Sequence, residues 1–217
     1  WQSEVFAAIK SMEMYGILNE HDEVKKAKDI EDYAGSMMAM KALYGDQAKI
    51  SEYLTTQRRS GMSFYRFGEN FRLNVLPALV QEAGGATTGQ QAMTAYQTIA
   101  GGTILRKGTQ IPMLRKYGLY DQKTGRFKQD FIDKFVDDPT VAAADLIERA
   151  EKLYGKNDPK LIDKLLSDLG KMAPNRNMAQ FFANMIRNKD NIHKHIEAMK
   201  LARKELEAIA KGEFLAA

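Results

Sequence analysis

The sequence predicts an all-α protein, a compact multi-helix domain of about ten helices with at most one minimal β-hairpin near residues 119–128. Two observations lead to this fold class. Apolar residues recur at helical spacing along most of the chain. Glycine, proline and Asp-Pro pairs separate the periodic segments, as at helix ends and starts. Hydrophobic residues make up 44% of the 217 residues and charged residues 28%, which favours a folded core over disorder.

The N-terminal part is predicted to form helices over residues 3–18, 22–45 and 46–61. Asp22 and Glu23 supply the acids that favour a helix N-terminus. Asp46 is a candidate N-cap for the third helix, because its carboxylate can accept from the first free N–H groups. Gly45 and Gly61 mark the ends of the second and third helices.

Residues 63–101 are predicted to form a central helical hairpin. Pro77 lies inside the first periodic run, and it should kink or divide that helix because it has no N–H and its ring clashes with the preceding turn. Gly84 and Gly85 end the run, and Thr87 or Thr88 opens the second helix. Helices joined by so short a glycine turn should lie antiparallel and pack against the helices on both sides.

The remaining chain is predicted to continue with a short helix over 108–118, a hairpin in LYDQKTGRF, and helices over 127–137, 139–155, 159–170, 175–188 and 192–209. The last is a long amphipathic helix. These elements indicate an N-terminal half, residues 1–117, and a C-terminal half, residues 118–217, or else one single domain. The first residue is Trp1 and the carboxyl end trails off after a helical pattern, so a fragment of a longer chain is expected.

No catalytic motif is visible, and the expectation is a non-enzymatic chain without cofactor or metal. There is no cysteine, and His193 and His195 are two residues apart, which places them on different faces of a helix. Glu52, Glu69 and Glu82 are candidates for a glycosidase that cuts peptidoglycan, but nothing marks two of them as the required pair. No apolar run approaches the roughly 20 residues of a membrane span.

A basic segment is the one charge feature with a candidate function. Between Thr103 and Lys128 there are seven basic residues and one acidic residue. Six of the bases are candidates for contact with an anionic partner: Arg106, Lys107, Arg115, Lys116, Arg126 and Lys128. Tyr117, Tyr120 and Phe127 interleave with them and fit either base stacking or a small core. A solvated surface is the commoner explanation of such a run.

The succession FRLNVLPALVQEAGG, QQAMTAYQTIAGGTIL and LRKYGLYD resembles the central region of phage tail tape measure proteins. Asp138-Pro139 and Asn175-Arg176 before MAQFFANMI continue the match in the same order. The resemblance covers residues 30–191 and rests on ordered helix breaks, with no catalytic signature among them.

The resemblance implies a structural component of a bacteriophage or prophage tail, one that sets tail length and assists DNA ejection. The implied partners are tail tube proteins, tail tip proteins and tail assembly chaperones, and self-association stays open. The implied locations are the lumen of the virion tail and, during assembly, the host bacterial cytoplasm. A helical nucleic-acid-binding module that uses residues 106–128 is the alternative.

Overall fold

The computed structural model of the chain describes residues 2–103 and 107–210, and it confirms the all-α fold class. The described residues form twelve α-helices. These are α1 (Gln2–Tyr15), α2 (Glu23–Tyr44), α3 (Ile50–Ser60), α4 (Met62–Arg66), α5 (Leu76–Ala83), α6 (Gly85–Ile99), α7 (Lys107–Lys116), α8 (Gln129–Asp137), α9 (Pro139–Tyr154), α10 (Leu161–Met172), α11 (Arg176–Arg187) and α12 (Lys189–Ala210).

The predicted β-hairpin is also present. β1 (Tyr120–Asp121) and β2 (Arg126–Phe127) pair antiparallel, with Tyr120 opposite Phe127 and Asp121 opposite Arg126. Gly125 in the connecting turn has a φ of 69°, a conformation that glycine adopts without a steric cost. The hairpin follows α7 and leads into α8, so it lies at the start of the predicted C-terminal half.

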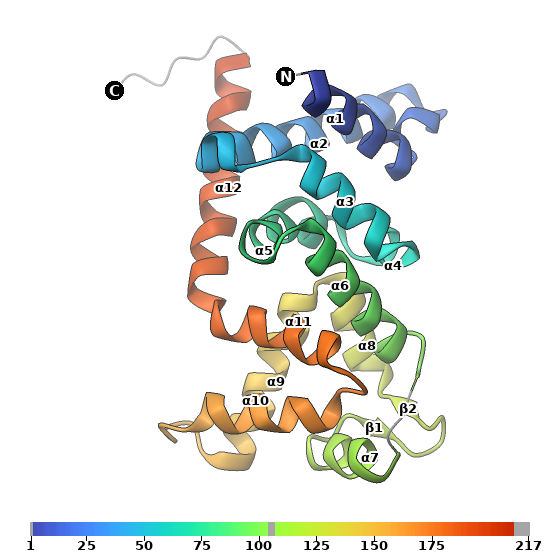
Figure 1. The fold of residues 1–217 in the computed structure, drawn as a ribbon, viewed down its shortest axis with the longest axis vertical. Coiled ribbons are helices and arrows are strands. Elements are labelled where there is room, and N and C mark those ends of the chain that lie inside the picture. The colour runs from blue at the N-terminus through green and yellow to red at the C-terminus, as the bar shows by residue number, and fades with distance from the viewer. Residues whose placement is uncertain (1, 104–106, 211–217) are drawn as a thin grey trace.

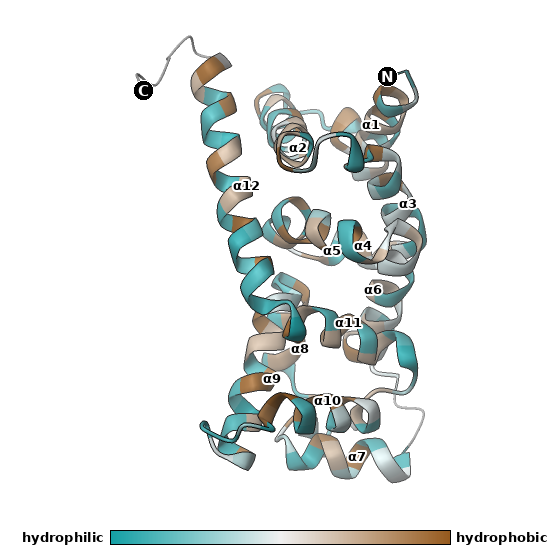
Figure 2. Cartoon of the chain, turned by 60° about the vertical axis from the view of Figure 1, so that its left-hand side comes forward, coloured by the Kyte–Doolittle hydropathy of each residue, from teal (hydrophilic) through white to brown (hydrophobic). Residues whose placement is uncertain are grey.

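The helices are stacked along the long axis of the molecule (Figure 1). Helices α1 and α2 lie at one end, and α7 and α10 lie at the other. Helix α12 runs along the axis instead and packs on α2. Brown and teal residues alternate along α12 in Figure 2, as expected for the predicted amphipathic helix.

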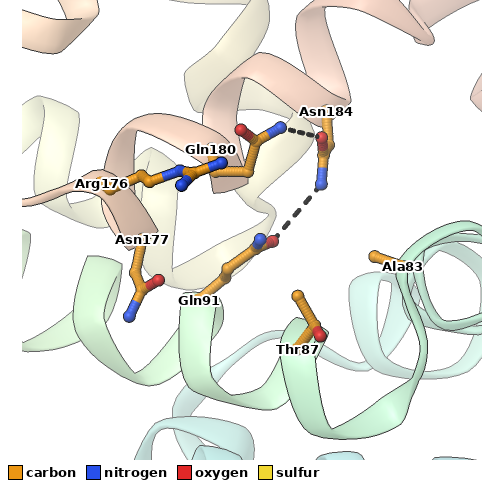
Figure 3. Close-up of a pocket in the computed structure, with 7 residues that line it drawn as sticks. All are labelled: Ala83, Thr87, Gln91, Arg176, Asn177, Gln180 and Asn184. Atoms are coloured by element: carbon orange, nitrogen blue, oxygen red, sulfur yellow. Dashed lines mark hydrogen bonds between the residues drawn. The ribbon is translucent and has the colours of Figure 1, made fainter.

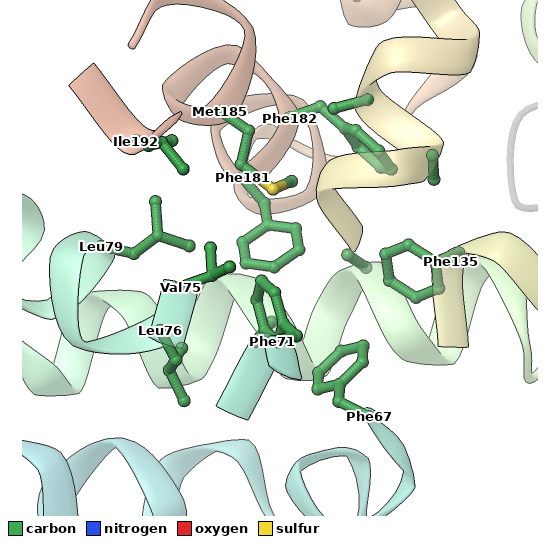
Figure 4. Close-up of a cluster of buried hydrophobic side chains, with 14 of the residues drawn as sticks. Phe67, Phe71, Val75, Leu76, Leu79, Phe135, Phe181, Phe182, Met185 and Ile192 are labelled. Atoms are coloured by element: carbon green, nitrogen blue, oxygen red, sulfur yellow. The ribbon is translucent and has the colours of Figure 1, made fainter. Parts of the chain in front are cut away.

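One buried cluster contains residues of both predicted halves (Figure 4). The Phe67 and Phe135 rings meet edge to face with centroids 5.5 Å apart, and Phe71 meets Phe181 at 6.3 Å. Aromatic pairs in this geometry add about 0.5–1.5 kcal/mol each beyond the area they bury. This cluster crosses the boundary near residue 118 that the prediction of two halves would set.

The first predicted helix of the central segment is irregular at two places. The first break follows Phe67, where the N–H of Gly68 donates to the carbonyls of Val136 and Asp137, both at 3.0 Å, at the end of α8. A Cβ on Gly68 would lie 2.1 Å from the Asp137 oxygen, so only glycine allows this approach. The second irregularity is a π-helical turn, Phe71–Val75, which continues without interruption into α5, where Pro77 is the second residue.

This π-turn frees backbone carbonyls that other helices use. The Leu76 N–H bonds to the Phe71 carbonyl, five residues back, and Pro77 has no N–H to offer. The Arg72 carbonyl therefore accepts from the Tyr53 hydroxyl of α3 at 2.8 Å, and the Leu73 carbonyl accepts from the Ser36 hydroxyl of α2. The helix therefore continues through Pro77 with a π-helical turn before it and is not divided there, and the freed carbonyls anchor two neighbouring helices.

Helix α12 reaches the same turn through a buried histidine. His195 is 8% exposed, its Nδ1 bonds to the Tyr44 hydroxyl, and the two rings stack at 5.4 Å. Burial lowers the pKa of His195 to about 4, although the backbone of Asn74 favours the charged form. As the pH falls, the unfolded chain therefore binds a proton at this histidine before the folded chain does. Neutral His195 thus contributes stability to the fold above pH 6.5, and that contribution is lost as the pH falls toward 4.

We expect the free energy of unfolding to fall more steeply from pH 7 to 4.5 in the wild type than in His195→Gln. The difference should reach about 2 kcal/mol, because glutamine has no proton to bind. Urea unfolding at each pH measures it, and the exposed His193→Gln is the matched control. Parallel pH profiles for the wild type and His195→Gln would contradict the assignment.

The α3 N-terminus differs from the prediction. Asp46 lies in a 3₁₀ turn, Gly45–Gln47, and α3 begins later, at Ile50. The Glu4 carboxylate of α1 accepts from the Ile50 N–H at 2.6 Å and from the Ser51 hydroxyl at 3.1 Å. The cap thus comes from a helix that is distant in sequence, and local spacing does not show it.

Helices α5 and α6 do not form the expected antiparallel hairpin. In Figure 1, α5 is seen nearly end-on whereas α6 runs across the view. The second helix begins at Gly85, before Thr87 and Thr88, and its closest packing is on α3 and α11. A single residue, Gly84 with a φ of 78°, separates α5 from α6 and redirects the chain.

Candidate anion-contact residues and a polar groove

The six predicted contact residues are held in different ways. Arg106 lies outside the described residues. Four of the six are exposed, namely Lys107, Arg115, Arg126 and Lys128. Within residues 2–103 and 107–210, none of these four forms an ion pair. Arg115 lies over the Tyr120 ring, with the guanidinium carbon 5.2 Å from the ring centre. An exposed basic surface at α7 and the hairpin is therefore present.

Lys116, the remaining predicted residue, has a structural role. Its Nζ lies 3.1 Å from the Asp168 carboxylate on α10 and 4.6 Å from the Tyr154 ring centre. Asp168 is 4% exposed and also accepts from the hydroxyls of Tyr117, at 3.0 Å, and Tyr154. Burial alone would raise the pKa of Asp168, but these hydrogen bonds outweigh it and leave the pKa below the ordinary value. Lys116 thus helps to fasten α7 to α9 and α10.

The interleaved aromatic residues belong mainly to the core. Tyr117 is 2% exposed and Phe127 is 3% exposed, and the Phe127 ring stacks on Phe131 with centroids 5.8 Å apart. Only Tyr120 is partly accessible, and Arg115 covers its ring. Two of the three candidate stacking residues are therefore not available to a nucleic-acid base.

The candidate carboxylates are engaged separately. Glu52 accepts from the Gly85 N–H at 2.8 Å, and Glu82 accepts from the Asn188 side chain at 2.6 Å. Glu69 lines a pocket beside α2 together with Asp29 and Asp32. No contact in the described part of the chain brings two of the three glutamates together as a glycosidase pair.

A polar groove that the sequence did not indicate lies between α6 and α11 (Figure 3). Its lining includes Thr87 and Gln91 of α6 and, from α11, Arg176, Asn177, Gln180 and Asn184, around a volume of about 450 Å³. A neighbouring pocket of about 340 Å³ shares Thr87 and Asn177 and adds Gln90 and, from α3, Arg59. We call these two pockets, which share Thr87 and Asn177 in their lining, the amide groove.

Three carboxamide side chains of the amide groove are linked in series by hydrogen bonds. Gln180 donates to the Asn184 oxygen at 2.7 Å, and Asn184 donates to the Gln91 oxygen at 3.4 Å (Figure 3). Gln91 is only 5% exposed. Asn175 begins α11 by accepting from the N–H groups of Asn177 and Met178, at 3.0 and 3.3 Å.

One signal in the sequence corresponds to this groove. Asn177, Gln180 and Asn184 are spaced by three and four residues, so they share one face of α11. The opposite face buries Met178, Phe182 and Met185. A helix face of uncharged amides is distinct from the Lys and Glu of an ordinary solvated face, but the facing residues of α6 are known only from the fold.

No group of three or more His, Asp or Glu side chains suited to a metal ion occurs in residues 2–103 and 107–210. Within the same ranges, no helix is long and apolar enough to cross a membrane. The fold thus defines an all-helical domain with a basic surface and an amide-lined groove. Comparison with protein-family models, curated proteins and solved structures finds no match to this chain.

Proposed function

We propose that this chain is a helical domain of a phage or prophage tail tape measure protein, with a structural and non-enzymatic role. The proposal rests on the resemblance of residues 30–191 to that family. In this role the domain belongs to a longer chain in the tail lumen that sets tail length and assists DNA ejection. Its partners are tail tube and tip proteins and, in the host cytoplasm, the assembly chaperones.

The observation that carries the proposal is where the resembling motifs lie in the fold. Asp138 caps α9 by accepting from the Thr140 N–H at 2.9 Å, and it also accepts from Asn70 at 2.9 Å. Phe71 of the first motif packs on Phe181 of the last. Motifs that are far apart in sequence therefore form one central core, as expected if their order preserves a common domain.

Tail morphology tests this proposal. In the phage or prophage that encodes the chain, purified tails should contain it. Deleting about 40 residues from an elongated helical stretch of the parent protein should shorten the tails by about 60 Å, at 1.5 Å per helical residue. Immunoblotting and electron microscopy of purified tails measure both. Tails that lack the chain, or whose length does not change, would refute the role.

The second candidate function is nucleic-acid binding by the exposed bases of α7 and the hairpin. If this is correct, the logarithm of the binding constant for duplex DNA should fall by about 0.9 per phosphate contact for each tenfold increase in salt. The double variant Lys107→Gln/Lys128→Gln should reduce that slope by about two contacts. Fluorescence anisotropy across 50–300 mM salt, a range set by the strong salt dependence of such binding, provides the measurement. Salt-independent or absent binding removes this candidate.

A further inference from the structure

We propose that the amide groove binds an extended, acidic peptide segment of a partner protein. Helices α6 and α11, which pack on each other, present the groove, and other residues of the same helices, Ala92, Ala95 and Phe181, are buried in the core. The helix backbones that carry its side chains are therefore held in place by the fold. A preformed site of this kind loses less conformational entropy on binding than a flexible surface does.

The carboxamides favour a peptide main chain. Each one presents a donor and an acceptor side by side, which matches the N–H and C=O groups of a peptide unit. The contact of 3.4 Å from Asn184 to Gln91 is long for a hydrogen bond, so it is easily exchanged for a contact with a ligand. Gln91, which is largely buried, keeps an oxygen directed toward this position (Figure 3).

The charges favour an acidic segment. Arg59 and Arg176 line the two pockets and are exposed, and neither has a carboxylate partner in the described part of the chain. No Asp or Glu lines either pocket. The nearby Glu52 and Glu82 are bonded to Gly85 and Asn188. A guanidinium binds a carboxylate through two parallel hydrogen bonds, so each arginine can hold one acidic side chain.

Other ligand classes fit the groove less well. No aromatic side chain lines either pocket, whereas single-stranded nucleic acids are bound through bases stacked on aromatic rings. An amphipathic helix would need apolar holes for its side chains. Here the apolar lining is limited to Ala83 and Ala86. An extended chain with polar and acidic side chains is the class that remains.

Nuclear magnetic resonance of the side-chain amides tests the proposal. The probe is an acetylated and amidated eight-residue peptide of alternating Asp and Ser, compared with its Lys-Ser counterpart and with an eight-nucleotide oligothymidylate. The acidic peptide should shift the NH₂ signals of Gln91, Gln180 and Asn184 in a saturable manner, with a dissociation constant of about 1 mM or below. The lysine peptide should leave these signals unchanged.

Variants separate groove binding from general charge attraction. Arg59→Gln/Arg176→Gln should weaken binding of the acidic peptide at least about tenfold. Lys107→Gln/Lys128→Gln removes the same charge from another surface and should leave binding unchanged. Gln180→Ala, which keeps both arginines, should weaken binding and leave the thermal melting of the domain intact. Three results would overturn the proposal: no saturable shifts, equal weakening by both double variants, or oligothymidylate binding as tight as that of the peptide.

Discussion

Gly89→Ala is expected to lower the free energy of unfolding by about 2–4 kcal/mol, because the added methyl group would clash with helix α3. A Cβ at position 89 would lie 2.6 Å from the Cβ of Arg59 and 2.7 Å from the Thr56 carbonyl oxygen. Both atoms belong to or adjoin the α3 backbone, so a side-chain rotation cannot relieve the clash. Helices α3 and α6 would have to separate.

Gly170→Ala is the matched control, because it makes the same change inside a helix with free space around it. No atom lies within 4 Å of a Cβ at position 170, and the residue is in α10, away from the α3–α6 contact. Alanine is the better helix former there, so this variant should gain about 0.5–1 kcal/mol. Urea unfolding of both variants gives the comparison. A neutral or stabilising Gly89→Ala would show that α3 and α6 are not packed as closely as described.

Asp168→Ala is expected to cost about 3 kcal/mol. The carboxylate is buried at the meeting point of α7, α9 and α10, where it accepts from Lys116 at 3.1 Å and from the Tyr117 hydroxyl at 3.0 Å. Alanine leaves the Tyr117 hydroxyl without its acceptor and Lys116 beside a cavity. Each unsatisfied buried group costs more than the bond it contributed.

The same network predicts how the loss of stability ranks among substitutions of its members. Tyr117→Phe should cost about 1 kcal/mol, because it removes one donor and keeps the ring. Lys116→Met should cost less than Asp168→Ala, since the Lys116 side chain is 38% exposed and regains water when unpaired. Asp163→Ala, an exposed acid in the first turn of the same helix, is the control and should cost under about 1 kcal/mol. Thermal and urea unfolding of the series measure these costs. A larger loss of stability in Asp163→Ala than in Asp168→Ala would contradict the structural role of Asp168.

Local sequence signals predicted those parts of the fold that depend on neighbouring residues. Asp138-Pro139 begins α9 and Asn175 begins α11 because each cap side chain reaches an N–H two residues further on. Pro77 follows a π-helical turn, Phe71–Val75, and the N–H that it lacks leaves carbonyls of that turn free, but the helix is not divided. The start of α3 was not predicted, because Glu4 of another helix caps it. Residues 46 positions apart meet only after folding.

The candidate site likewise has features that the sequence predicted and features that only the fold shows. A run of bases in the sequence predicted an exposed positive surface, and Lys107, Arg115, Arg126 and Lys128 lie on one. Spacing could not tell that Lys116 faces a buried acid on α10, since Asp168 is 52 residues away. The amide groove was missed for a related reason. Its two walls come from α6 and α11, and each wall alone resembles an ordinary polar helix face.

The sequence by itself determined that this protein is all-helical, where most helices begin and end, and which residues carry a resemblance to tape measure proteins. Those features follow from periodicity, caps and breaks within a few residues. The tertiary structure alone decided what Gly85 and Gly89 do. The sequence predicts that Gly85 ends a helix, yet both glycines place the α6 backbone against α3. A Cβ at Gly85 would lie 2.1 Å from the Glu52 carbonyl oxygen. A glycine that ends a helix and one that admits another helix look alike in sequence, because what distinguishes them is the partner that folding brings into contact.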